Sequence, residues 1–256
     1  MLAPLNASSL PDFTTACAHD RVFGSRALTA LHTYGLGDPH ARFFLCLKGR
    51  EPAAALYLAD KVLTVSADDR ADPAPIAELA AREGVHEIDT NRAQCEALQR
   101  LLGGTIDSSY TMVYRGGQVE EIFTGVAPGE LGTVFSVLQR SHEYYRTHLQ
   151  FDPWAADLSR KLDRGLSEVY QLTRGGEVVG TGCIASEDDE CGVIAAVAVV
   201  PEWQRQGFGS LMTRFLVQRI RQKGKTPLLL SGYDAVAEVY RKIGFSVCGR
   251  WGELYL

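Results

Sequence analysis

The sequence predicts an α+β protein made of two similar units, each with a central, mostly antiparallel mixed sheet flanked by helices. Short apolar segments joined by tight turns, of which Gly175-Gly176 is the clearest, are typical of antiparallel hairpins. Between them lie amphipathic stretches with helical spacing. The same order of elements occurs twice along the 256 residues, and this length allows two domains of ordinary size.

In the first half, apolar runs bounded by turn residues predict strands at residues 42–47, 53–58, 61–66, 85–89 and 110–114. Two amphipathic helices are expected between these strands. The first follows the favourable start Asp72-Pro73, includes residues 76–82 and stops at Gly84. The second can be capped by Asn91 and runs to about residue 102, where two glycines end it.

The second half repeats this order. Strands are expected at residues 119–123, 168–174, 177–184, 193–200 and 227–230, with one or two more within 245–255. Helices are expected at residues 130–145, 207–223 and 235–242. The run 193–200 is almost wholly apolar, which is typical of a strand buried on both faces. We place the boundary at Gly116-Gly117, which gives domains at 1–117 and 118–256.

Composition and sequence pattern argue against several classes of function. The formal net charge is -5 and the basic residues are scattered, which argues against nucleic acid as a partner. No pair among the six cysteines has C-x-x-C spacing, so we expect no metal and buried free thiols. The N-terminus lacks the pattern of a signal peptide, and no apolar run is long enough to cross a bilayer. We therefore expect a cytoplasmic protein without a membrane partner.

The most informative segment follows the buried strand 193–200. It runs from Val199-Val200-Pro201 through Gln204-Arg205-Gln206-Gly207-Phe208-Gly209-Ser210 into the helix predicted at 207–223. The first turn of a helix carries unpaired N–H groups and the positive end of the helix dipole. Glycines let phosphate oxygens approach these groups closely, so the segment predicts a pyrophosphate site. A Rossmann site is the competing interpretation, but the third glycine of its motif is missing.

This segment resembles the GNAT superfamily of N-acyltransferases, whose motif is Gln/Arg-x-x-Gly-x-Gly/Ala after a strand ending in a Val-x-Pro-like segment. Here Gln204, Gly207 and Gly209 fill the motif. About thirty residues later, the run from Tyr240 to Phe245 is similar to the family's Tyr-x-x-x-Gly-Phe signature. The resemblance covers roughly residues 119–256. One departure is Tyr233, which stands where relatives often have Asn.

The resemblance implies direct transfer of an acetyl group from acetyl-CoA to an amine. It implies that the backbone near Val199 polarises the thioester carbonyl and that Tyr240 donates a hydrogen bond or a proton to the departing thiolate. The cofactor-binding residues that it implies are Val197, Val199, Gln204, Arg205, Gln206, Gly207, Phe208, Gly209, Ser210 and Tyr240.

The sequence leaves the general base and the acceptor open. Relatives often carry a Glu on the strand before the phosphate loop, whereas here the nearest acidic residues, Glu187 and Glu190, belong to a predicted solvated turn. Asp152, Trp154 and Asp157 lie where the family builds its acceptor pocket, although a helix cap or a surface ion pair also explains the two carboxylates. The partners expected are acetyl-CoA and an amine acceptor on a small molecule, peptide or protein.

The first half resembles a GNAT-type unit without its cofactor loop, because Pro and Asp follow its third strand. A degenerate copy followed by an intact one is similar to two-domain acetyltransferases of bacteria. The first copy is expected to shape the acceptor site or a homodimer interface. Two alternatives to an enzyme remain open at this point: an acyl-CoA-binding sensor without turnover, and a structural fold whose site is inactive in both halves.

Overall fold

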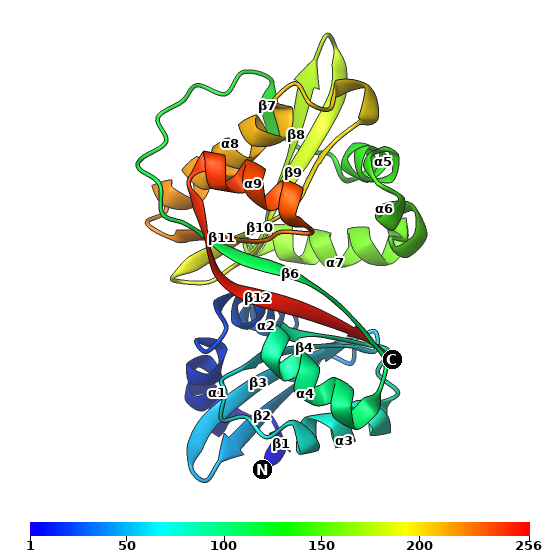
Figure 1. Ribbon diagram of the computed structural model, residues 1–256, viewed down its shortest axis with the longest axis vertical. Helices are drawn as coiled ribbons and strands as arrows, with labels where there is room; N and C mark the ends of the chain where they lie inside the picture. Colours follow the sequence, from blue (N-terminus) through cyan, green and yellow to red (C-terminus); the bar gives the residue numbers. More distant parts are fainter. The chain divides into compact units, whose positions relative to one another are not determined.

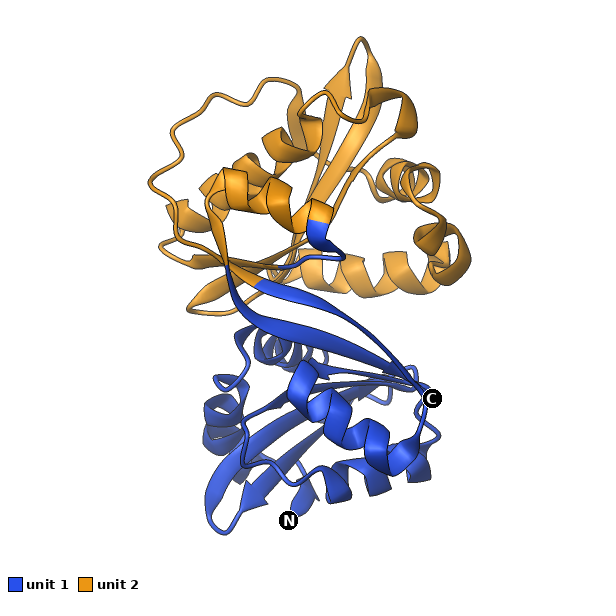
Figure 2. Ribbon diagram, in the orientation of Figure 1, with its two compact units in different colours: residues 1–111, 230–234, 247–256 blue, residues 112–229, 235–246 orange.

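The computed structural model describes all 256 residues, which pack into two compact units (Figure 2). Unit 1 contains residues 1–111, 230–234 and 247–256, and unit 2 contains residues 112–229 and 235–246. Each unit is an α+β structure with a mostly antiparallel mixed sheet and flanking helices, which confirms the predicted fold class. The domain boundary at residue 117 stays a prediction, and the last ten residues pack with unit 1.

Unit 1 has helices on both faces of its sheet (Figure 1). Its strand order is β1-β2-β3-β4-β5-β12-β6, and the β4–β5 pair is parallel. The strands are β1 (Leu2–Pro4), β2 (Arg42–Lys48), β3 (Glu51–Ala59), β4 (Val62–Ala67), β5 (Glu87–Asn91), β6 (Thr105–Tyr114) and β12 (Phe245–Tyr255). The helices are α1 (Leu10–Cys17) and α2 (Arg21–Tyr34) on one face, and α3 (Pro73–Glu83) and α4 (Arg92–Leu102) on the other.

The helices α1 and α2 precede the first strand expected from the sequence. Asp20 begins α2, because its side chain accepts hydrogen bonds from the N–H groups of Val22 and Phe23. Phe13 on α1 is fully buried and meets Phe43 edge to face at 6.0 Å. These two helices therefore cover one face of the sheet, and unit 1 has a core on each side.

Unit 2 has the strand order β11-β10-β9-β8-β7, in which only β10 and β11 run parallel. Its strands are β7 (Val126–Pro128), β8 (Glu168–Arg174), β9 (Glu177–Glu187), β10 (Cys191–Val199) and β11 (Thr226–Leu230). Its helices are α5 (Leu131–Ser141), α6 (Glu143–His148), α7 (Phe151–Asp163), α8 (Phe208–Gln222) and α9 (Asp234–Ile243). In both units, three antiparallel pairs are followed by one parallel pair.

Two expectations for unit 2 are wrong. Residues 119–123 form no strand: Glu121 pairs with Arg214 and Phe123 packs on Phe215, so this segment lies against α8. The helix expected at 130–145 is two helices, α5 and α6. The break falls at His142, which has an extended backbone and whose Nδ1 accepts the N–H of Tyr144 as the cap of α6.

No helix of this structure has both the length and the apolar composition that crossing a membrane requires. The six cysteines are all free thiols. Five are buried as expected, whereas Cys248 is exposed.

Three carboxyl groups lie close together in unit 1, on neighbouring strands. Asp89 and Glu253 are direct partners across β5 and β12, and Glu87 lies on the same face of β5. Arg26 of α2 donates a hydrogen bond to Asp89 at 3.1 Å. Burial raises the pKa of Asp89 to about 6, despite this guanidinium. Burial also raises the pKa values of Glu87 and Glu253.

This cluster predicts that protonation of Asp89 contributes to the stability of unit 1 at acidic pH. Between about pH 4 and pH 6 the Asp89 carboxyl is protonated only in the folded protein, so its contribution to the free energy of unfolding falls as pH rises through that window, by about 3 kcal/mol in total. Asp89→Asn should therefore raise the unfolding temperature at pH 8 and change it little at pH 4. In this variant, Arg26 still has the carboxylates of Glu87 and Glu253 as neighbouring charges. Calorimetry at both pH values, with the exposed Asp69→Asn as control, checks this; a lower unfolding temperature for Asp89→Asn at pH 8 would contradict it.

Candidate cofactor and acceptor site

The strand β10 separates from its neighbour β11 half-way along its length. The two strands pair in parallel only over Cys191–Ile194 and Thr226–Leu229. Immediately beyond, Ala196 has a left-handed φ of 51°. The register against β9 shifts between Ala195 and Ala198, so β10 carries one extra residue there, a β-bulge. Past the bulge, β10 has a strand partner on the β9 side only. We call its unpaired edge on the β11 side the wedge.

The predicted residues Val197 and Val199 offer their backbone groups to this wedge. Val200 donates its N–H to Val179 on the β9 side, at 2.9 Å. Because N–H groups alternate in direction along a strand, the N–H groups of Val199 and Val197 point to the opposite, open side. The wedge is therefore lined by backbone donors that no neighbouring strand uses.

The predicted phosphate loop connects β10 to α8. It passes through the short 3-10 turn Pro201–Trp203 and reaches Gly207, which has a φ of 85° and is the N-cap of α8. No side chain caps this helix. Leu211 makes the first bond within the helix, to the carbonyl of Gly207. The N–H groups of Phe208, Gly209 and Ser210 are thus directed toward an anion-binding position at the helix start.

Side chains of the loop hold its shape. Gln204 donates its side-chain amide to the carbonyl of Val199 at 2.9 Å, which ties the loop to the end of β10. Gln206 donates weakly to the carbonyl of Glu202 at 3.4 Å. Phe208 packs against Trp203 and lies under the guanidinium of Arg174. Arg205 is exposed, with a left-handed φ of 60°.

Tyr240, the predicted general acid, is half-buried on α9 and packs edge to face on Phe245, with ring centroids 5.9 Å apart. Phe245 in turn contacts the ring of Tyr114. Since β10 and β11 are parallel, the loop after β10 and the helix α9 after β11 begin at the same edge of the sheet. This topology brings Tyr240 and the phosphate loop to one edge of unit 2.

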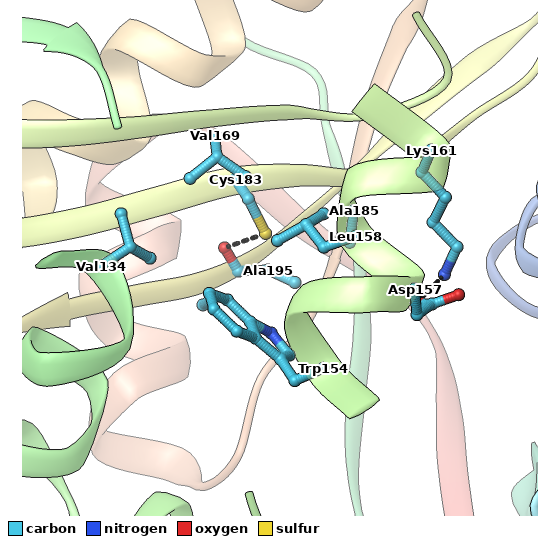
Figure 3. A pocket seen from close by; sticks show the side chains of 10 residues that line it. Val134, Trp154, Asp157, Leu158, Lys161, Val169, Cys183, Ala185 and Ala195 are labelled. Atoms are coloured by element: carbon cyan, nitrogen blue, oxygen red, sulfur yellow. Dashed lines mark hydrogen bonds and ion pairs between the residues drawn. The ribbon is translucent and has the colours of Figure 1, made fainter. Parts of the chain in front are cut away.

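A cavity of about 180 Å³ lies on the face of the sheet that α5 and α7 cover (Figure 3). It is lined by Val134 of α5, by Trp154, Asp157, Leu158 and Lys161 of α7, and by Val169, Cys183, Ala185, Ala195 and Ala196 of the sheet. Two of the three predicted acceptor residues, Trp154 and Asp157, are among them. The third, Asp152, is exposed in the first turn of α7 and does not line the cavity.

Cys183 faces this cavity, but its thiol is not a reactive nucleophile. Its thiol donates a hydrogen bond to the carbonyl of Ala195 at 3.3 Å. Burial raises the pKa of the thiol to about 12, so the nucleophilic thiolate is not formed at neutral pH. No sequence pattern indicated that Lys161 or the small residues Ala185 and Ala195 would complete the cavity wall.

Glu187, expected in a solvated turn, is instead buried at the end of β9. Its two oxygens accept hydrogen bonds from Lys223 at 2.6 Å and Lys225 at 2.7 Å. Lys223 also pairs with Glu168. Burial by itself would raise the pKa of the Glu168 carboxyl. Hydrogen bonds from Lys223, Tyr170 and Arg219 nevertheless hold this pKa at about 2. Glu187 is therefore part of an ion-pair network that ties β8 and β9 to the end of α8.

This network predicts that Glu187 acts in stability rather than catalysis. Glu187→Gln should lower the free energy of unfolding by about 1–3 kcal/mol, because two lysines lose a buried charged acceptor. We expect kcat to change by less than about twofold. Urea unfolding and acetyl-transfer assays on this variant, beside the exposed Glu190→Gln, separate the two roles; a large fall in kcat with unchanged stability would identify Glu187 as a base.

The corresponding region of unit 1 is closed. The helix α3 starts with Pro73, Ala74 and Pro75, and the one N–H group among them is bound by Asp72 at 3.0 Å. Thr90 and Asn91 of β5 donate side-chain hydrogen bonds to the carbonyls of Val65 and Ala67 on β4. Side chains therefore bridge β4 and β5 beyond their last paired residues, and the first three residues of α3 offer no N–H group to a phosphate.

Comparison with known proteins agrees with this description of unit 2. Residues 132–245 match the sequence model of the Acetyltransferase (GNAT) family. No curated protein matches the sequence significantly.

Solved structures match nearly the whole length of the chain. A GCN5-related N-acetyltransferase from Kribbella flavida has a TM-score of 0.61 at 17% identity, covering 92% of this chain and 94% of its own. A tandem GNAT protein from the clavulanic acid biosynthesis pathway has a TM-score of 0.62 at 12% identity, covering 99% and 97%. A GCN5-related N-acetyltransferase from Sphaerobacter thermophilus has a TM-score of 0.63 at 15% identity, covering 99% and 94%.

Residues 132–245, most of which lie in unit 2, are thus similar to the GNAT family of acetyltransferases. Almost the whole chain has the fold seen in a tandem GNAT protein.

Proposed function

We propose that this protein transfers an acetyl group from acetyl-CoA to a primary amine by direct attack, and that unit 2 holds the active site. The observation that supports this most strongly is the wedge beside β10, which leads to the uncapped N-terminus of α8. The wedge offers backbone N–H donors to the thioester of acetyl-CoA, and the start of α8 offers converging N–H groups to its pyrophosphate.

The pyrophosphate of acetyl-CoA is held by the start of α8. The N–H groups of Phe208, Gly209 and Ser210 converge there, and each dipole interaction contributes only about 0.3–1 kcal/mol when exposed, so several are required. Gly207 and Gly209 have no atom within 4 Å of the position a Cβ would take, which leaves room for phosphate oxygens. Gln204 and Gln206 hold the loop, and Arg205 adds a positive charge.

The reaction requires one bond to form and one to break. The neutral amine nitrogen attacks the thioester carbonyl, a C–N bond forms, the C–S bond breaks, and the thiolate takes a proton from Tyr240. The nitrogen releases its extra proton to solvent, and the Tyr240 phenolate regains a proton from solvent, so the step balances. The N–H of Val199 stabilises the negative charge that develops on the carbonyl oxygen. Such a donor typically contributes about 3–4 kcal/mol, and a positioned general acid about 10²–10⁴-fold.

Deprotonation of the amine is the remaining requirement. An alkylamine with a pKa near 10.4 loses its proton at pH 7 at a cost of about 4.6 kcal/mol. Glu187 is bound by two lysines and Asp157 by Lys161, so neither is well suited to take that proton. The apolar cavity supplies another route, because desolvation lowers the pKa of an ammonium group.

An acyl-CoA sensor without turnover is the second candidate, and the lack of a carboxylate on β10 favours it. Two measurements separate the candidates: calorimetric binding of acetyl-CoA, and release of CoA across a panel of amines. Amine-dependent release with a matching acetylated product supports the transferase. Tight binding without release by any amine supports the sensor, and no binding at all would remove both.

A further inference from the structure

The cavity beneath α7, defined above by its ten lining residues and here named the acceptor cavity, has almost entirely apolar walls. Aliphatic or small side chains form most of it, and the indole of Trp154 closes one side (Figure 3). The cavity adjoins the two irregular positions of the sheet, Ala185 on β9 and Ala195–Ala196 on β10. A group bound there would lie beside the strand that borders the wedge.

The acceptor cavity offers no unbalanced charge. Its only charged side chains, Asp157 and Lys161, are one turn apart on α7 and pair with each other at 2.6 Å. Cys183 is present as the neutral thiol. A cationic or anionic group entering this space would lose its hydration and find no free counter-charge, which is strongly unfavourable.

The volume and the neighbouring side chains suit an aromatic or branched aliphatic group. An apolar cavity of about 150 Å³ is large enough to bind benzene, and this cavity has about 180 Å³. Trp154 also belongs to an aromatic cluster with Phe135 and Phe151, whose ring centroids lie 5.6 and 6.3 Å from its own. Phe151 is 41% exposed, so this cluster reaches the surface beside the cavity.

The polar side chains show which end faces solvent. Asp157 and Lys161 lie at the α7 end, where their side chains are 39% and 20% exposed, whereas Cys183 lies buried against the sheet. A ligand that enters from solvent past α7 arrives independently of acetyl-CoA. This favours the amine acceptor as the occupant over a long acyl chain attached to CoA.

We propose that the acceptor is a primary amine carrying an uncharged apolar group of about the size of a phenyl ring, and that this group binds in the acceptor cavity. The proposal rests on the proposed function. It predicts discrimination against polyamines and other acceptors whose substituent is charged, and it lets the same apolar walls favour the neutral, reactive form of the amine.

The test compares phenethylamine with 1,4-diaminobutane, by calorimetric binding to the CoA-saturated protein and by acetyl transfer. We expect phenethylamine to bind at least about tenfold more tightly and to be acetylated with the higher kcat/KM. Ala185→Leu fills the cavity and should weaken phenethylamine binding at least about tenfold, with the CoA dissociation constant unchanged. Ala156→Leu, on the exposed side of the same helix α7, is the matched control and should change neither. Trp154→Ala, which removes a wall, provides a second variant if Ala185→Leu folds poorly.

The outcomes separate this inference from the proposed function. Tighter binding of 1,4-diaminobutane, or phenethylamine binding that neither cavity variant weakens, would overturn the inference. Selective loss of octanoyl-CoA relative to acetyl-CoA binding in Ala185→Leu, with phenethylamine unaffected, would assign the cavity to an acyl chain and also overturn it. Absence of CoA binding would defeat the proposed function alone; phenethylamine binding to the CoA-free protein, lost in Ala185→Leu, would then still support the cavity's ligand.

Discussion

Replacement of Tyr240 by Phe is expected to lower kcat by about 10²–10⁴-fold while leaving the affinity for acetyl-CoA within about twofold of wild type. The ring of Tyr240 is held by Phe245 at 5.9 Å, and Phe preserves that contact. Only the hydroxyl is lost, and with it the proton that the departing thiolate receives. Steady-state release of CoA, monitored with a thiol-reactive dye, gives kcat, and calorimetry gives the dissociation constant of acetyl-CoA.

The matched control for this prediction is Tyr233→Phe. Tyr233 lies just before α9 and is 58% exposed, so loss of its hydroxyl should change kcat little. If both variants kept wild-type kcat, the thiolate would be leaving without the help of Tyr240. If both lost affinity for acetyl-CoA together with activity, the hydroxyl would serve binding instead of proton transfer.

Local signals account for the parts of the fold that were predicted well. Asn91 caps α4 as expected, with its side chain accepting the N–H of Gln94. Gly175 and Gly176 both have positive φ and connect β8 to β9 where the sequence predicts a hairpin. In each case one residue type satisfies one backbone requirement, so the signal is contained within a few residues of sequence.

The features that were missed depend on contacts distant in sequence or on conformations without a residue signature. The last strand, β12, pairs with β5, which lies more than 150 residues earlier in the sequence, and no local sequence pattern predicts this pairing. The bulge at Ala196 stands in a run of Val, Ile and Ala that predicts a regular buried strand. Alanine has no preference for a left-handed φ. The sequence therefore does not predict the β-bulge that precedes the wedge and borders the acceptor cavity.

The candidate site was predicted from glycines and a tyrosine at set spacing, and its residues stay a prediction; the unpaired edge of β10 had no such signal in the sequence. The sequence distinguished the two halves by the motif that unit 1 lacks. The structure adds the physical reason. At the start of α3, Asp72 accepts the single N–H group present, and the two prolines have no N–H group to offer. In unit 2 the equivalent donors remain available, since Gly207 has no side chain with which to cap them.

Gly207→Val should therefore weaken acetyl-CoA binding at least about 100-fold, or about 2.7 kcal/mol. Gly207 has a φ of 85°, and a β-branched residue in that conformation costs at least about 1–2 kcal/mol, so the loop must rearrange. The new methyl groups would also project into the open space that phosphate oxygens need. Calorimetric titration with acetyl-CoA and with free CoA measures the loss, which should be similar for both because they share the pyrophosphate.

The control lies at the other end of the same helix. Gly224 follows α8 with a φ of 76° and equally open surroundings, so Gly224→Val introduces comparable strain far from the phosphate loop. Both variants should lower the unfolding temperature, but only Gly207→Val should lose the cofactor. Equal loss of binding in both would mean that strain in α8, rather than a blocked phosphate position, is responsible. Wild-type affinity in Gly207→Val would remove the loop from the binding site, because no acyl-CoA could then approach its backbone as closely as the helix N-terminus requires.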